Sequence, residues 1–354
     1  MEEPPRNPKF GLLKCPFALR EEVIGNMDFM DAFHFSTLSK RSKQMVRKAR
    51  YQIDFIKFRF EENIKNDRIE VKIKNNDWLK ISMSDSNDPP VRDPTMIDGL
   101  KLANLIDEPS DDYRKKLSAH ILSIFHFKST HVHLERNIEH LDDLFLWDIR
   151  KQFDCVEVCL SRCDDISPED LQLVLNNLVS KSYLLEFELN DSSYKYQKPL
   201  KYCESLDVRG SCQWLDPENI LQRNPQMKDL NLEDLPGEQV NNLLKQWING
   251  EGIGLESMGF EISWYNGIDY PDNVIFDGID TMETKLTEEQ ANRMIVIWRH
   301  RGRTVDIQRK TDGRFATVHL CHSGCYVWMW HTKFFRNIMQ IRSVPKIKKT
   351  VVKR

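Results

Sequence analysis

Apolar residues recur along this chain with two spacings, and the spacing changes near residue 51. Before that point the period is helical, with Pro16 suited to the first turn of a helix and Asp28 and Ser39 suited to capping two more. The first helix carries an apolar stripe of Leu19, Val23, Ile24 and Met27. We therefore predict a flexible, proline-rich tail over 1–9 and three short helices over 10–50.

The second predicted helix is apolar on all sides, with Phe29, Phe33 and Phe35 spread around its axis at about 100° per residue. Such a helix must be covered on every side, and three short helices bury too little surface to do so alone. Two interpretations stay open: this segment is an interaction module, or it is the first layer of the main core.

From residue 51 onwards, short runs of alternating apolar residues predict strands, such as Ile53 to Phe60 and Ile69 to Ile73. The segment 84–94 is rich in Asp, Pro and Ser and predicts a surface loop. A helix is predicted from Asp111 to Phe125. Residues 51–150 are interpreted as strands and a helix that begin a larger array.

One pattern, apolar-x-x-apolar-x-apolar, occurs five times between Phe153 and Phe260, with intervals of 31, 19, 24 and 28 residues between the central positions. The five sets are Phe153/Val156/Val158, Leu184/Phe187/Leu189, Cys203/Leu206/Val208, Met227/Leu230/Leu232 and Leu255/Met258/Phe260. Helix starts lie in the gaps, at Ser167-Pro168, Asp216-Pro217 and Pro236. Residues 151–265 therefore predict an irregular, leucine-rich-repeat-like β/α array, with an ordinary α/β sheet as the alternative.

After Tyr265 the pattern changes again. Thr287 to Gln290 has the form of a capping box before a helix, and Asp312-Gly313 predicts a hairpin turn. We predict a helix-hairpin cap over 266–335, followed by a basic tail over 336–354. The predicted fold class is α+β or α/β.

Composition and charge disfavour several classes of protein, namely nucleic-acid-binding, membrane and phosphate-loop proteins. The formal net charge is -3 and the isoelectric point is near 6.4, so a nucleic-acid partner is disfavoured. No apolar run is long enough for a bilayer span, and no apolar signal segment is present, so we expect a cytoplasmic or nuclear protein without a membrane partner. The 14 glycines argue against glycine-rich phosphate loops.

Candidate chemistry is sparse. No serine-hydrolase, nucleotide-binding, zinc-protease or kinase motif is present. Cys155, Cys159 and Cys163 recur every four residues, Cys321-His322-x-x-Cys325 follows His319, and His131-Val132-His133 places two histidines on one strand face. None has the spacing of a zinc knuckle, so we interpret the thiols as structural and predict no metal, no cofactor and no enzymatic activity.

The stretch from Leu13 to Val46 resembles an F-box. The matching positions are Cys15-Pro16, Val23-Ile24, Met27, Asp31, Phe35, Leu38 and Ser39-Lys40-Arg41. The sequence departs from the motif at Cys15, where leucine is usual, and after Arg41, where an aromatic residue is usual. The resemblance implies that these helices bind a Skp-type adaptor and, through it, a cullin.

A second resemblance lies downstream. Leu244-x-x-Trp247-x-x-Gly250 followed by Leu255-Glu256 is similar to the type 2 F-box-associated domain of a nematode F-box family. That resemblance implies that 151–265 recruits a target protein, which the sequence does not identify.

Together these observations predict a non-enzymatic substrate receptor of a Skp-cullin-F-box ubiquitin ligase. The predicted adaptor contacts are Leu13, Cys15, Pro16, Leu19, Val23, Ile24, Met27, Phe29, Phe33 and Leu38. Two alternatives remain: a leucine-rich-repeat-like interaction scaffold unrelated to ubiquitination, and a metal-dependent enzyme built on the cysteine and histidine clusters.

Overall fold

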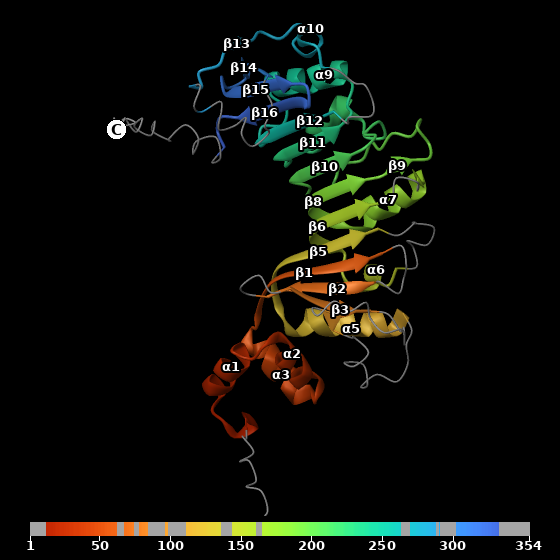
Figure 1. Cartoon of the computed structure of the whole chain (residues 1–354), viewed down its shortest axis with the longest axis vertical. Coiled ribbons are helices and arrows are strands. Elements are labelled where there is room, and N and C mark those ends of the chain that lie inside the picture. Colours follow the sequence, from red (N-terminus) through yellow and green to blue (C-terminus); the bar gives the residue numbers. More distant parts are fainter. Residues whose placement is uncertain are drawn as a thin grey trace, which may run out of the picture. The chain divides into compact units, whose positions relative to one another are not determined.

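The computed structural model describes residues 12–61, 67–73, 78–83, 96–97, 111–135, 144–160, 165–262, 270–287, 290 and 302–332. The chain divides into two compact units, Met1–Leu160 with Asn176–Leu178 (unit 1) and Ser161–Leu175 with Val179–Arg354 (unit 2). Their helices and strands are labelled in Figure 1. No helix in the described ranges is both long enough and apolar enough to cross a membrane.

Unit 1 begins with three short helices, as the periodicity predicted, and continues into a mixed sheet with further helices. The helices are η1 (Leu12–Lys14), α1 (Phe17–Gly25), α2 (Phe29–Thr37), α3 (Lys40–Ala49), α5 (Asp111–Ile124) and α6 (Leu146–Ile149). The strands are β1 (Gln52–Phe60), β2 (Arg68–Lys72), β3 (Trp78–Ser82), β4 (Met96–Ile97), β5 (His126–Leu134) and β6 (Gln152–Cys159). The predicted loop over 84–94 lies outside the described residues.

In unit 1, β1, β5 and β6 run parallel, while β2 pairs antiparallel with β1 and β3. The register places Phe58 beside Val132 and Val132 beside Val156. All three are fully buried. Strands β1 and β5 thus lie in register beside β6, as expected of a segment that begins the array, although Ser129 takes the place of the first apolar residue in the β5 row.

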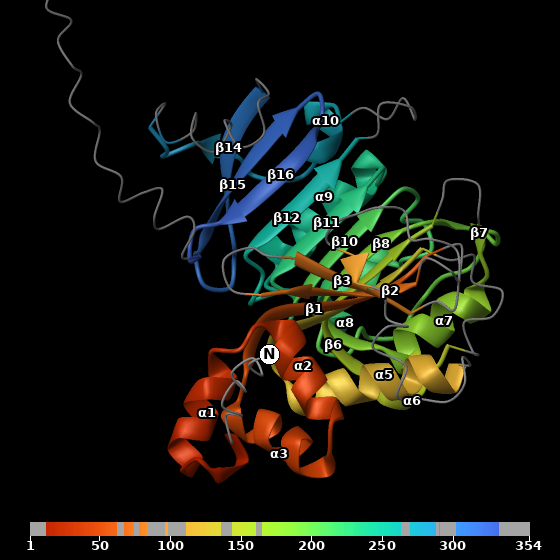
Figure 2. The same ribbon diagram turned by 60° about the horizontal axis from the view of Figure 1, so that its bottom comes forward.

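Helix α5 packs against α3 and contacts α2, so it contributes to the core of the N-terminal helices (Figure 2). The ring of Phe29 stacks on Phe125 with centroids 4.7 Å apart, and Tyr51 donates a hydrogen bond to the carbonyl of Met27 at 3.0 Å. The hydroxyl of Ser36 and Nε2 of His120 lie 2.8 Å apart. Phe29 and Phe33 of α2 are thus buried inside unit 1, while Leu38 at the end of α2 stays 72% exposed.

Unit 2 contains parallel strands that alternate with helical segments, followed by an antiparallel region. Its strands are β7 (Asp165–Ile166), β8 (Val179–Glu186), β9 (Glu188–Leu189), β10 (Ser205–Arg209), β11 (Asp229–Glu233), β12 (Ser257–Glu261), β13 (Met282–Glu283), β14 (Gly302–Gln308), β15 (Phe315–Cys321) and β16 (Gly324–Met329). Its helices are α7 (Pro168–Asn177), η5 (Pro217–Asn219), α8 (Ile220–Arg223), α9 (Gly237–Ile248) and α10 (Asp272–Ile275).

Strands β8, β10, β11 and β12 are parallel and in register, with Leu206 beside Leu230 and Leu230 beside Met258. These central residues are at most 1% exposed, as a sheet face covered by helices requires. Three helix starts are confirmed, because α7, η5 and α9 begin directly after Ser167, Asp216 and Pro236.

One set of the predicted repeat is wrong. The structure places Tyr183 and Leu185 of β8 beside Leu206 and Val208, not Phe187 and Leu189. The first position of this row is the buried Ser180, whose backbone N–H donates to the hydroxyl of Tyr183 at 3.1 Å. A buried serine interrupts the apolar pattern, so the periodicity selected the next apolar run instead.

The antiparallel end of unit 2 differs from the predicted cap. The Asp312-Gly313 hairpin is present, with β14 and β15 paired and Gly313 at φ 71°, but a third strand, β16, pairs with both β15 and β12. Thr287 and Gln290 exchange capping-box hydrogen bonds, while the rest of the predicted helix lies outside the described residues. The structure shows a mixed sheet with interspersed helices and neither a leucine-rich-repeat solenoid nor a helix-hairpin cap among the described residues.

The β14–β15 turn is held by a buried arginine. Arg309 is 0% exposed, and its Nε and Nη2 donate to the two carboxylate oxygens of Asp312 at 2.9 and 2.6 Å. The guanidinium also lies 5.2 Å from the ring centroid of the buried Trp247 in α9. Hydrogen bonds from Arg309 and neighbouring groups lower the pKa of Asp312 to about 2. Arg309 therefore connects the β14–β15 turn to α9: it forms an ion pair with Asp312 in the turn and packs against Trp247 in the helix.

We predict that Asp312→Asn lowers the free energy of unfolding of this unit by about 1.5 kcal/mol, because the buried Arg309 loses its charged acceptor while the exposed position of Asp312 limits the loss. Urea denaturation at pH 7 measures the change, with the exposed Asp280→Asn as the matched control. Adding Arg309→Met should recover part of the loss. Equal stability of the Asp312 and Asp280 variants would contradict this role of the pair.

A second prediction concerns His120, whose burial, together with the nearby Lys43, lowers its pKa from 6.5 to about 4. Between these pH values the unfolded chain binds the proton more tightly than the folded chain, so stability falls as the pH drops from 6.5 towards 4. His120→Asn should remove this component, which for one proton reaches at most about 1.4 kcal/mol per pH unit. Denaturation at pH 7 and pH 5 tests it; an unchanged pH dependence, equal to that of His126→Asn, would contradict it.

Candidate functional site

Local sequence signals fix the three N-terminal helices. The carboxylate of Asp28 accepts a hydrogen bond from the backbone N–H of Asp31 at 2.7 Å at the start of α2. Ser39 and Ser42 form a reciprocal capping box at the start of α3, at 3.0 and 2.9 Å. Pro16 is the N-cap of α1, one position earlier than its predicted place in the first turn. The caps at Asp28 and Ser39 satisfy backbone N–H groups that the first turn of a helix leaves without a partner, whereas Pro16 makes no side-chain cap hydrogen bond.

The ten predicted adaptor contacts differ in how much of each residue is exposed to solvent. Pro16, Leu19 and Leu38 are exposed, Cys15, Val23 and Met27 are partly buried, and Ile24, Phe29 and Phe33 are buried. Leu13 lies in η1, and its side chain is outside the described residues. Leu38 is 72% exposed and Leu19 is 44% exposed, whereas Ile24, Phe29 and Phe33 are at most 2% exposed. In this structure the last three side chains serve the core, because α3 and α5 cover the sides of the helices that carry them.

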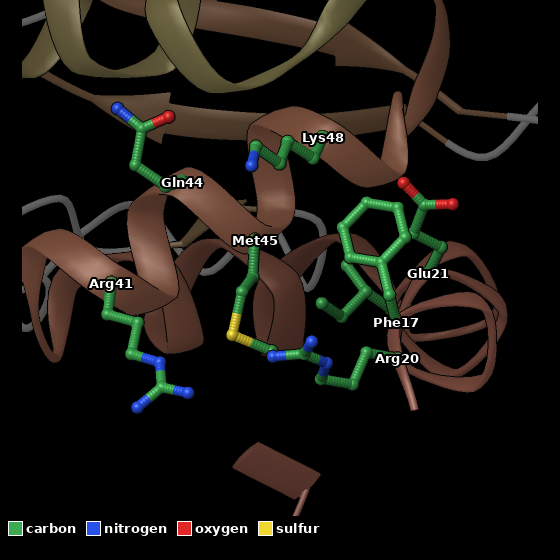
Figure 3. A pocket seen from close by; sticks show the side chains of 8 residues that line it. Phe17, Arg20, Glu21, Arg41, Gln44, Met45 and Lys48 are labelled. Atoms are coloured by element: carbon green, nitrogen blue, oxygen red, sulfur yellow. The ribbon is translucent and has the colours of Figure 1, made fainter. Parts of the chain in front are cut away.

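A small open groove lies between α1 and α3, with a volume of about 170 Å³ (Figure 3). Its residues are Phe17, Arg20, Glu21, Ile24, Arg41, Gln44, Met45 and Lys48. Figure 3 shows the ring of Phe17 and the thioether of Met45 near its middle, with charged side chains around them. Three of the lining residues are basic and one is acidic. The groove therefore suits an apolar side chain that lies beside a carboxylate.

Phe17 is a candidate contact that the sequence reasoning missed. Its ring is 49% exposed. The guanidinium of Arg20 lies 5.8 Å and the ammonium of Lys48 lies 5.7 Å from the ring centroid. The signal available in the sequence was an aromatic residue directly after the helix-starting proline, but it falls off the apolar stripe that the periodicity identified.

The segment from Lys40 to Arg50 contains six basic residues and no acidic one, a composition typical of a solvated helix face. In the structure Lys40, Arg41, Arg47 and Lys48 of α3 are exposed. Arg41 and Lys48 also line the groove, so two of these charges lie beside the exposed ring of Phe17. The run therefore gives the groove its positive charge.

The comparisons with known proteins give one match. No curated protein and no solved structure matches the chain. Neither a type 2 F-box-associated domain nor a nematode-specific family is shown. The family model for the F-box domain matches residues 12–52, a segment that contains α1, α2, α3 and the groove. Residues 12–52 of this chain are therefore an F-box domain, the type of module that binds a Skp1-type adaptor.

Proposed function

We propose that this protein is a substrate-recognition subunit of a Skp-cullin-F-box ubiquitin ligase, with the F-box on the adaptor and the rest of the chain on a target protein. The observation that carries the proposal is the F-box domain at residues 12–52, which keeps large apolar side chains exposed. F-box proteins are typically non-catalytic, and transfer of ubiquitin then belongs to other subunits.

For the adaptor contact, the exposed residues are the best candidates. Phe17, Leu19 and Leu38 present apolar surface that the folded chain does not cover. Aromatic and aliphatic side chains that become buried on association supply most of the energy of such interfaces. The basic groove beside Phe17 adds a preference for an adaptor surface with a carboxylate next to an apolar residue. The buried side chains of Ile24, Phe29 and Phe33 hold the helices that carry these exposed residues in place.

For the target contact, we propose the open sheet face of unit 2. Glu233 of β11 and Glu261 of β12 lie directly opposite each other, and like charges in that position destabilise a sheet. Burial, then the neighbouring Asp207 and Glu233, raises the pKa of Glu261. Carboxylates gathered on neighbouring strands support a binding role for this face, and the hydrogen bond that Glu233 accepts from the N–H of Gly210 at 2.7 Å holds one of them in place. The residues of the target, and its identity, do not follow from this chain.

The scaffold alternative makes the opposite prediction about the adaptor. A protein unconnected with ubiquitination would keep its N-terminal helices only to cover α5, and their exposed face would have no partner. Adaptor binding therefore separates the two functions.

We predict that Leu19→Asp combined with Leu38→Asp abolishes binding of the full chain to a Skp1-type adaptor, because both charges fall on exposed apolar positions. Co-expression followed by affinity purification measures binding. Tyr202→Asp is the matched control, since Tyr202 is 70% exposed and lies in unit 2. Circular dichroism should give equal folded content for all three proteins.

Point variants test this more cleanly than removal of the F-box. Deleting residues before 51 would expose Phe125 and Ile121 of the α5 region, which are now at most 5% exposed. Loss of binding after such a truncation could reflect misfolding. Retained binding by the double aspartate variant, or no binding by the natural chain, would exclude the proposed adaptor surface.

A further inference from the structure

Three potential metal ligands lie together on one face of the sheet in unit 1. They are His131 on β5 and Cys155 and Glu157 on β6, and one ligand atom of each lies within 4.8 Å of the others. The strand register places His131 directly beside Cys155, although 23 residues separate them in sequence. The sequence alone could not bring these clusters together, because strand pairing decides it.

The distances suit a zinc ion after a small contraction. Nδ1 of His131 lies 3.9 Å from Oε1 of Glu157, and Sγ of Cys155 lies 4.0 Å from the same oxygen. With the usual bond lengths to zinc of about 2.0–2.3 Å and tetrahedral angles, such pairs are separated by about 3.3–3.6 Å. These two pairs need to close by roughly half an ångström, and the His131–Cys155 pair, which lies within 4.8 Å, by about 1 Å or less.

The carboxylate of Glu157 is oriented with one oxygen towards the other two groups. Its Oε2 accepts from Nζ of Lys57 at 2.5 Å and lies 2.8 Å from Nδ1 of His133. Its Oε1 is the atom that faces His131 and Cys155. Burial alone would raise the pKa of Glu157, but His131, His133 and Lys57 hold it well below its usual range.

The imidazole of His131 is oriented in the same way. Its Nε2 lies 2.7 Å from the hydroxyl of Ser129, and its Nδ1 has no hydrogen-bond partner among the described residues. The ring of Phe55 covers one side, with centroids 4.2 Å apart. A polar group on the second ring nitrogen is the usual support of a metal-binding histidine. The side chains of His131 and Glu157 are 21% exposed, so an ion could enter from solvent.

We propose that His131, Cys155 and Glu157 form a zinc site with a fourth position open to solvent. A thiolate with an imidazole favours Zn²⁺ over Mg²⁺ or Ca²⁺, which prefer oxygen ligands alone. Three protein ligands and one open position allow water, or a group from a bound protein, to complete the coordination. This site is independent of adaptor binding by the F-box.

Titration of the purified full chain with Zn²⁺ against a chromophoric chelator tests the site. We expect one equivalent to bind, with an affinity at least about tenfold lower for Cys155→Ser and for His131→Gln. Cys159→Ser is the matched control, since this thiol lies on the same strand two residues beyond Glu157. Zn²⁺ should raise the melting temperature of the natural chain and of Cys159→Ser only.

Co²⁺ provides a second readout that a purely structural role would not change. Binding through Cys155 should give a thiolate-to-metal charge-transfer band in the natural chain and in Cys159→Ser, and no band in Cys155→Ser. Because serine replaces a partly buried thiol at nearly the same size, the metal-free variant should fold normally, as circular dichroism can verify. Equal Zn²⁺ affinity of Cys155→Ser and the natural chain, or no binding by the natural chain, would overturn the proposal.

Discussion

The register of the parallel strands is the constraint on which the rest of this structure depends. In each unit the strands place their buried residues at matching heights, as Leu206, Leu230 and Met258 do in unit 2. A slip of one residue would turn every such side chain to the opposite face of the sheet. Burial of one face therefore fixes the pairing, and the pairing in turn fixes which polar residues share the open face. The Glu233–Glu261 pair and the His131–Cys155 pair both result from it.

The F-box shows how a binding module can share its core with the body of the chain. Phe29 stacks on Phe125, and Ser36 contacts His120 in α5, so the three helices are not packed only against one another. This packing buries apolar side chains of α2, such as Phe29 and Phe33, that the isolated helices would expose. The exposed large apolar side chains of this segment are Phe17 and Leu19 on α1 and Leu38 at the end of α2. The basic residues of α3 and the exposed ring of Phe17 lie beside one another, so this surface is both positively charged and apolar.

The open face of the sheet in each unit carries a cluster of polar and charged groups. In unit 1 the side chains of Lys57, His133 and Glu157 form a partly buried network around a trio of metal-ligating types. In unit 2 acidic groups gather on neighbouring strands, and burial raises the pKa of Asp207. Polar groups held together at such a cost are typical of sites that meet a partner or an ion.

The sequence by itself determined the local elements. Asp28 and Ser39 start helices through hydrogen bonds within three residues, and the apolar rows around Leu206, Leu230 and Met258 identify strands because each row reflects one buried face. The F-box motif was also readable, because its spacing lies within one short segment. Tertiary structure alone decided which of its residues are exposed, where β8 lies in the array, and that His131 meets Cys155. Those outcomes depend on contacts between segments that are distant in the chain, which no local pattern encodes.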